Sequence, residues 1–200
     1  MPEHPARTAH RCVFADGSVS GKTVLVSGRA GAVGGFAVSF AKWGGAEVVA
    51  TIDSEEQAAA ALEAGADHTL NYRTDDVAAR VWGITEGWGV DRIVEIALGR
   101  NLALDAEMIA QLGTIAAYSS DANAEPRLPF WPLLFKNVMI RLVGSDDLAE
   151  RRAIEDIKAA LGAGVLRPRV ARRLPLERIA EAHEAIEGGQ SGGRVVLDID

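Results

Sequence analysis

The chain has 200 residues, of which 48% are hydrophobic and 24% charged, so it can bury one substantial core. Its formal net charge of -7, with no arm or stripe of Lys and Arg, argues against nucleic acid or an anionic membrane as a partner. The single Cys12 and four scattered histidines supply no zinc site, and no apolar run approaches the ~20 residues that span a bilayer, so we expect a metal-free, cytoplasmic protein.

Short β-branched runs alternate with Ala-rich segments from Thr23 onward, which is the pattern of βαβ units and a parallel sheet. In chain order we expect strand 23–28, helix 33–43, strand 47–52, a helix between Ser54 and Gly65, strand 68–72, a helix from Thr74 to about Ile84, strand 90–97, helix 104–112, strand 114–119, strand 137–144, helix 148–161, helix 177–188 and a closing strand 193–199. The expected fold is α/β, a Rossmann-type doubly wound parallel sheet with a C-terminal helix-strand extension.

The same pattern divides the chain into three parts. Residues 1–22 are expected to form an N-terminal helix and linker, residues 23–145 the Rossmann domain, and residues 146–200 the C-terminal helices and final strand. Within the domain, Ser54 with Gln57 three residues later predicts a capping box. Acidic residues directly after Thr74 suit the positive end of a helix dipole.

A glycine-rich turn, Gly28 to Gly34, lies where the first strand ends and the first long helix begins. A dinucleotide pyrophosphate needs such a turn, because glycines permit close backbone approach and free N–H groups meet the anion. The spacing Gly-x-x-Gly-x-x-Gly is a weak motif by itself, and its strand-turn-helix-strand context strengthens it. The alternative is a turn that only packs the helix on the strand.

Asp53 lies 19 residues after Gly34, at the end of the second expected strand. A carboxylate at about this distance binds the hydroxyls of an adenosine ribose and repels the additional phosphate of NADP. Equally, Asp53 could point into solvent and simply precede the helix cap.

Four stretches together resemble a known family: TAHRCVFADG, GKTVLVSGRAGAVGGFAVSFAKWGGAEVVATIDSEE, AGADHTLNYRTDDVAARV and LPLERIAEAHEAIEGG. They are similar to the zinc-free medium-chain dehydrogenase/reductases, specifically the NADPH:quinone oxidoreductase or zeta-crystallin branch. The likeness runs from about Thr8 to the end, and the order of the motifs is more specific than any one of them. It implies that the pyrophosphate is held by Gly28, Gly31, Ala32, Val33 and Gly34.

The resemblance also places Ser54 and Tyr72 around the adenosine 2'-phosphate of NADPH users, although Tyr72 could equally be an ordinary half-buried strand aromatic. Several relatives have a lysine at the position of Gln57 and a small residue at that of Asp53. Losing a cation and gaining an anion both disfavour NADP, and Arg73 is the nearby positive charge that would offset them. We expect NADP(H), with NAD(H) as the alternative.

The chemistry implied by the resemblance is hydride transfer to a quinone or an α,β-unsaturated carbonyl, with no metal and no catalytic side chain assigned. Residues expected near the nicotinamide follow the strands at the carboxyl edge of the sheet or precede the domain: Thr8, Ala97 to Gly99, Tyr118, Ser119 and Ser120. None of the serines at strand ends lies in a Gly-x-Ser-x-Gly elbow, which disfavours a hydrolase.

Family members begin with a GroES-like barrel that shapes the substrate cleft, and we expect this sequence to start near the junction. The closing strand 193–199 folds back onto that barrel in the family, so here it is expected to expose an unpaired edge. The resemblance implies that strand 137–144 pairs with its twin in a homodimer; the alternative is an interior strand of the same sheet.

Three functions remain open from the sequence. The leading one is an NADP(H)-dependent oxidoreductase of quinone-reductase type, represented by its cofactor-binding part, with a small-molecule quinone or enone as substrate. The second is a catalytically silent dinucleotide-binding module that senses cofactor or pairs with a separate catalytic subunit. The third is a truncated product without function.

Overall fold

A computed structural model of the chain describes residues 3–28, 31–120, 125–144, 150–167, 170–188 and 194–199. In chain order the elements are α1 (Glu3–Val13), β1 (Thr23–Val26), α2 (Ala32–Trp43), β2 (Glu47–Ile52), α3 (Glu55–Glu63), β3 (His68–Asn71), α4 (Val77–Ile84), β4 (Val90–Glu95), α5 (Leu98–Met108), β5 (Ile109–Ala117), α6 (Phe130–Phe135), β6 (Met139–Leu142), α7 (Glu150–Gly162), β7 (Val170–Pro175), a 3-10 turn (Leu176–Arg178), α8 (Ile179–Glu187) and β8 (Arg194–Asp198).

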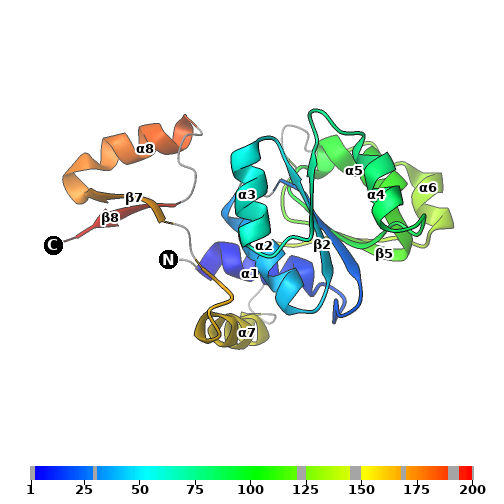
Figure 1. The fold of residues 1–200 in the computed structure, drawn as a ribbon, viewed down its shortest axis with the longest axis horizontal. Helices are drawn as coiled ribbons and strands as arrows, with labels where there is room; N and C mark the ends of the chain where they lie inside the picture. The colour runs from blue at the N-terminus through cyan, green and yellow to red at the C-terminus, as the bar shows by residue number, and fades with distance from the viewer. Residues whose placement is uncertain are drawn as a thin grey trace.

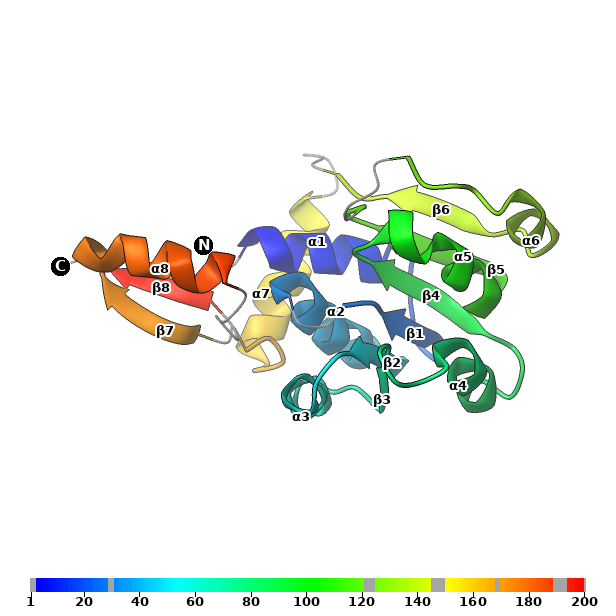
Figure 2. The ribbon, with the colours of Figure 1, turned by 90° about the horizontal axis from the view of Figure 1, so that it is seen from above.

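Six strands form one parallel sheet in the order β3-β2-β1-β4-β5-β6. The chain builds outward from β1 to β3, returns to place β4 beside β1, and builds outward again to β6, which makes the sheet doubly wound. Helices cover both faces (Figures 1 and 2). Buried side chains of α1, α2, α3 and α7 form one core, and those of α4, α5 and α6 form the other. The predicted Rossmann-type fold is confirmed.

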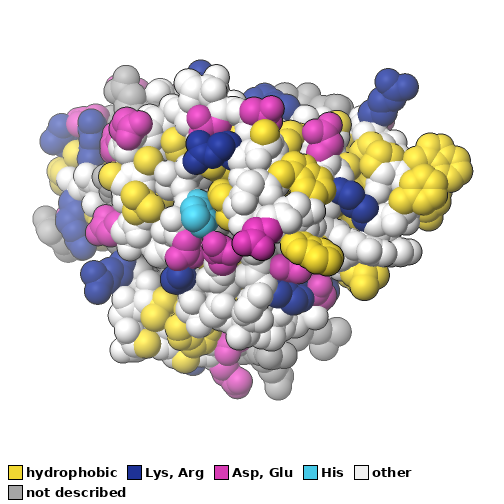
Figure 3. Space-filling view, turned by 45° about the vertical axis from the view of Figure 1, so that its right-hand side comes forward, with side chains coloured by type: hydrophobic (Ala, Val, Ile, Leu, Met, Phe, Trp, Pro, Cys, Tyr) yellow, Lys and Arg dark blue, Asp and Glu magenta, His cyan; other side chains and the backbone are white. Residues whose placement is uncertain are grey.

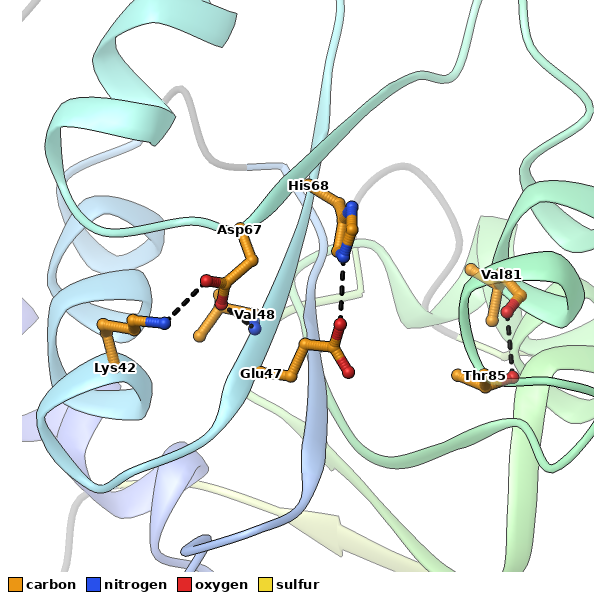
Figure 4. Close-up of polar contacts among 7 residues, drawn as sticks. All are labelled: Lys42, Glu47, Val48, Asp67, His68, Val81 and Thr85. Atoms are coloured by element: carbon orange, nitrogen blue, oxygen red, sulfur yellow. Dashed lines mark hydrogen bonds and ion pairs between the residues drawn. The ribbon is translucent and has the colours of Figure 1, made fainter.

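Polar side chains join β2 to β3 at the amino ends of these two strands (Figure 4). Asp67 accepts hydrogen bonds from Lys42 Nζ at 2.6 Å and from the Val48 amide at 2.8 Å, while His68 Nε2 lies 3.0 Å from Glu47 Oε1. Burial by itself would raise the pKa of Asp67, but the bonds from Lys42 and Val48 outweigh it and lower the pKa. These contacts fix the end of β2 that is opposite to the glycine turn.

Helix α1 is tied to the sheet by a buried cation. The side chain of Arg92, on β4, is fully buried and donates to the carbonyls of Cys12 and Val13 at the end of α1, and it pairs with Asp16. A positive charge at the last carbonyls complements the helix dipole. On the far side of α1, His10 Nε2 lies 2.7 Å from Asp156 Oδ2 of α7. The N-terminal helix is therefore part of the layer that covers this face.

Two expected helix boundaries were wrong. The helix expected at 104–112 spans Leu98–Met108, and Ile109 already pairs with Val90 as the start of β5. The run from 104 to 112 has apolar residues at helical spacing, but a short apolar run does not distinguish helix from strand. The helix expected to start after Thr74 is α4, which begins instead after Asp76. The Asp76 carboxylate accepts a hydrogen bond from the Ala79 amide at 3.0 Å.

The C-terminal part contains a strand that the sequence did not predict. Strand β7 is mostly exposed and rich in arginine, so it has no apolar run to reveal it. It pairs in parallel with β8, and α8 connects the two. The closing strand therefore has one neighbour, β7, while its other edge has no partner among the described strands, as expected. This unit lies to one side of the six-stranded sheet (Figures 1 and 2), and its strands and helix pack chiefly on one another.

Helix α6, in the Pro-rich loop before β6, was also not predicted. It is a short helix of six residues that begins after Pro129. Pro132 stands in its first turn, where a missing N–H costs no internal hydrogen bond. Its ring-bearing side chains are exposed, so the segment lacks the one-sided apolar pattern from which a surface helix is recognised.

Candidate dinucleotide-binding site

The candidate site lies at the carboxyl ends of β1 and β4, where the direction of strand order reverses. Open α/β sheets bind ligands in the crevice at this switch point. The turn after β1, the segments after β2 and β3, and the segments after β4 and β5 all meet the same edge of the sheet, because the strands are parallel. The residues proposed from the sequence are distributed over these five ends.

Gly28 forms the sharp part of the first turn. Its φ of 65° lies in the left-handed region, and a Cβ atom added here would stand 2.7 Å from Cγ2 of Ile96. The Gly28 amide donates to the hydroxyl of Thr51 at 3.1 Å, so this N–H already has an acceptor. Gly28 thus shapes the turn and allows Ile96, after β4, to approach it closely. Arg29 and Ala30, the next two residues of the motif, lie outside the described residues.

The start of α2 offers donors for an anion. Gly31 is the N-cap and supplies no capping side chain, and the first helical bond runs from the Gly35 amide to the Gly31 carbonyl at 3.2 Å. The amides of Ala32, Val33 and Gly34 precede that bond and have no acceptor within the helix. No acidic side chain stands in the first turn. Gly31 and Ala32 are exposed and Gly34 is buried, so at the start of α2 no acidic side chain of the first turn competes with a phosphate group for the positive end of the helix dipole.

Side chains at the ends of β2 and β3 meet around Asp53. The Tyr72 hydroxyl donates to Asp53 Oδ2 at 3.1 Å, Arg73 Nη2 lies 3.6 Å from the same oxygen, and the Arg73 guanidinium stands 5.8 Å from the Tyr72 ring centroid. The Asp53 amide donates to Gln57 Oε1, and Ser54 caps α3 by accepting from the Gln57 amide at 3.3 Å, as predicted. Asp53 is thus the common partner of a hydroxyl and a cation.

The segments after β4 and β5 are joined to each other. Ala97 forms an antiparallel bridge with Ser120, the Leu98 amide donates to the Ser119 carbonyl at 3.3 Å, and the Tyr118 amide donates to the Glu95 carbonyl at 3.1 Å. The structure thereby brings together the segments from which Ala97, Gly99, Tyr118 and Ser119 were proposed. The Tyr118 side chain packs against the core on the α2 face, and burial raises the pKa of its phenol.

Thr8, also proposed for this end, lies in the middle of α1 and is half-buried. Helix α1 packs against α2 and α7 and contacts the sheet through β4 and β5.

A buried polar cluster beneath the turn after β4 was not predicted. Glu95 is fully buried, and its Oε1 accepts from Ser27 Oγ at 3.1 Å, from Asn101 Nδ2 at 3.1 Å and from the Ala97 amide. Asp105, on α5, is buried beside it. The only sequence signal was a carboxylate that follows the apolar pair Ile93 and Val94 at the end of the strand, in the run VDRIVEIA. Ser27, considered above as a strand-end serine, belongs to this cluster.

Two further structural observations concern the described part of the chain. Within it, no three His, Cys, Asp or Glu side chains gather in an arrangement that could hold a metal ion. None of the helices there has the length and apolar character needed to cross a bilayer.

Comparison with known proteins gives consistent matches. The sequence model of the zinc-binding dehydrogenase family matches residues 32–161. A 2-haloacrylate reductase of Burkholderia sp is 33% identical over 185 residues, which cover 88% of this chain and 55% of that protein. The human quinone oxidoreductase is 28% identical over 200 residues, 96% of this chain and 60% of the relative. The chain therefore spans a little more than half the length of these relatives.

Solved structures match over nearly the whole chain. An NAD-dependent alcohol dehydrogenase superposes with a TM-score of 0.88 at 30% identity, covering 98% of this chain and 57% of the other. A mycobacterial protein solved in complex with NADPH superposes with a TM-score of 0.82 at 26% identity, covering 97% and 63%. The first of these structural neighbours is thus named for NAD, and the second is named as a complex with NADPH.

Proposed function

This chain belongs to the medium-chain dehydrogenase/reductases, in the part that the zinc-binding dehydrogenase model describes, and from that premise we propose that it is the cofactor-binding part of an NADP(H)-dependent reductase. The proposed reaction is hydride transfer to a quinone or an α,β-unsaturated carbonyl. The observation that carries the proposal is the uncapped start of α2 beside the Gly28 turn, at the switch point of the sheet. The names of the quinone oxidoreductase and haloacrylate reductase relatives support the substrate class.

The residues at the switch point fit a dinucleotide. A Cβ at position 28 would meet Cγ2 of Ile96, so glycine keeps the turn after β1 close to the end of β4, and the amides of Ala32, Val33 and Gly34 would hold the pyrophosphate. Asp53, Ser54, Tyr72 and Arg73 would hold the adenosine ribose at the ends of β2 and β3. The segments at 97–99 and 118–119 would lie along the nicotinamide end. When bound, the nicotinamide supplies the hydride, while the protein orients it and excludes water.

We propose NADP(H) as the cofactor and keep NAD(H) as the alternative. Arg73 supplies a positive charge beside the expected 2'-phosphate position, which favours NADP(H). The Asp53 carboxylate opposes this, because it repels a phosphate and already engages both Tyr72 and Arg73. The competition between Asp53 and a 2'-phosphate for the same two side chains decides the preference.

The experiment that tests the function is oxidation of NADPH upon addition of a quinone, measured for this chain and for the same chain joined to a substrate-binding domain of a relative. Turnover in either form supports the reductase. Measurable NADPH binding without turnover in both forms would favour the silent module instead.

One observation favours the second candidate function, the catalytically silent dinucleotide-binding module. The unit of β7, α8 and β8 packs chiefly on itself and exposes apolar side chains such as Ile179 and Ile186. A separate catalytic subunit that covers this unit would make the chain a cofactor-binding partner. Co-purification of a defined second subunit that restores turnover would distinguish it from a self-sufficient reductase.

We also propose that the chain forms a homodimer through residues 137–144. β6 is an edge strand of the sheet, and exposed apolar side chains gather on it and on the neighbouring α6 at one end of the molecule (Figure 3). They are Leu128, Phe130, Trp131, Leu134, Phe135, Met139 and Leu142. Pairing of two β6 strands would remove an open edge and cover much of this surface.

The buried free thiol of Cys12 supports a cytoplasmic location.

A further inference from the structure

The turn that follows β4 rests on two buried carboxyl groups. Glu95, at the end of β4, is 0% exposed, and Asp105, on α5, is 1% exposed. One oxygen of Glu95, Oε1, accepts the bonds from Ser27, Asn101 and the Ala97 amide. The other, Oε2, has no donor, and neither has Oδ2 of Asp105. Two buried carboxylate oxygens without donors are costly unless a proton joins them.

No cation compensates this pair from the elements packed around it. Arg92, on the same strand, points to the opposite face and binds α1. Lys136 is engaged by the backbone carbonyls of Ala106, Glu107 and Ile109 at the end of α5. Arg80 and Arg100 are exposed on α4 and α5. The titratable group that faces each carboxyl is the other one, while the phenol of Tyr118, whose pKa the nearby Glu95 helps to raise, packs on the α2 face of the sheet.

We propose that Glu95 and Asp105 hold one proton between them, and that this protonated pair is a positioning element for the turn at 96–99 of the proposed dinucleotide site. The proton makes one carboxyl the donor to the other, which leaves Glu95 Oε1 free to accept from Ala97 and Ser27. Burial, first, and the neighbouring carboxyl, second, raise the pKa of Asp105, and burial raises that of Glu95, in agreement with a shared proton.

The pair acts on the site through the backbone. Glu95 Oε1 holds the Ala97 amide, and Ile96 between them places its Cγ2 directly above Gly28. Ser27, just before Gly28, is held by the same oxygen. Loss of the proton would put two negative charges side by side in a buried site, and their repulsion would displace the turn from both Gly28 and the segment after β5. This inference rests on the proposed function, because it assigns the turn to the cofactor site.

The first test measures unfolding by urea across the pH range and needs no cofactor. The pair binds its proton more tightly in the folded chain than in the unfolded chain, so its contribution to stability is complete below the unfolded carboxyl pKa values and is lost as pH rises through the folded value. We expect the unfolding equilibrium constant of the wild type to rise about tenfold per pH unit within that window, the slope for one proton. In Asp105→Asn the amide donates permanently, and this component of the slope disappears.

The matched control is Glu107→Gln, which removes the charge of an exposed carboxylate on the same helix and should keep the wild-type slope. Glu95→Gln is the second variant, since its amide can donate to Asp105 while its oxygen still accepts from Ala97. A wild-type slope that both amide variants retain would overturn the shared proton.

The second test measures NADPH affinity over the same pH range. We expect the affinity of the wild type to fall about tenfold as the proton leaves, and that of Asp105→Asn to stay level through this window. Equal pH profiles in the two proteins would overturn the positioning role. A chain that binds no dinucleotide at any pH would overturn the proposed function and this role together, while the unfolding slope would still decide whether the proton is shared.

Discussion

The Cγ2 atom of Ile96, after β4, lies 2.7 Å from the point that a Cβ of residue 28 would occupy, after β1. The two neighbouring strand ends therefore approach each other as closely as a glycine allows. Because Gly28 also has a φ of 65°, both the backbone conformation and the available space require glycine at this position.

Replacing Gly28→Ala should lower the free energy of unfolding by about 2 kcal/mol, since the left-handed conformation alone costs a residue with a Cβ ~1–2 kcal/mol and Ile96 must also move. Urea denaturation measures the change. Adding Ile96→Ala should recover the steric part and leave the conformational part. Gly83→Ala is the matched control, because Gly83 lies in helix α4 with open space around it and should gain stability. Equal effects at the two glycines would refute the argument.

The Asp53→Ser variant should raise the affinity for NADPH relative to NADH by about tenfold or more, because it removes a negative charge and releases Tyr72 and Arg73. Parallel fluorescence titrations with the two cofactors give the ratio. Glu47→Ser is the control, since it removes the same charge from the opposite end of the same strand. An unchanged ratio in Asp53→Ser would remove this carboxylate from the ribose site.

Leu112 adopts a φ of 61° within the irregular part of β5, and its side chain is 73% exposed. Leucine gains little from burial here, while the left-handed conformation costs it ~1–2 kcal/mol. Leu112→Asn should therefore increase the free energy of unfolding by about 1 kcal/mol, because asparagine tolerates this conformation. Thermal denaturation should show a higher Tm. The control is Leu128→Asn, at an exposed leucine without positive φ, which should bring no such gain. Equal Tm changes in the two variants would contradict backbone strain at Leu112.

The Leu142→Glu variant should convert a dimer into a monomer, because like charges would face each other across paired β6 edges. Sedimentation velocity at micromolar concentrations distinguishes the two states. Leu62→Glu is the control, since α3 packs on β2 and β3 at the other edge of the sheet. A wild type that sediments as a monomer, or a Leu142→Glu variant that remains dimeric, would exclude this interface.

The sequence predicted the elements whose signals are local. The first four strands alternate with helices in the regular βαβ pattern, and Ser54 with Gln57 predicted the start of α3. The boundary between α5 and β5 could not be predicted, because it depends on Ile109 pairing with Val90 across the sheet. Strand β7 has no apolar run, and only its pairing with β8 makes it a strand.

The residues of the candidate site also divide into those recognised from local sequence signals and those brought together only by packing. The glycine spacing and Asp53 are readable along the chain, so their residues could be proposed in advance. The joining of Ala97 to Ser120, and the burial of Glu95 against Asp105, depend on how β4, β5 and α5 pack. A carboxylate directly after the apolar pair Ile93 and Val94 indicates a buried polar group, but its partner is known only from the fold.

The central claim is that the first turn of α2 binds a diphosphate, and Ala32→Glu tests it most directly. Ala32 is exposed at the first helical position, where an acidic residue favours the helix but repels an anionic ligand. Ala79→Glu makes the same change in the first turn of α4. In calorimetric titrations with NADPH we predict that Ala32→Glu abolishes binding, while Ala79→Glu and the wild type bind equally. Unaltered binding by a folded Ala32→Glu variant would contradict the account.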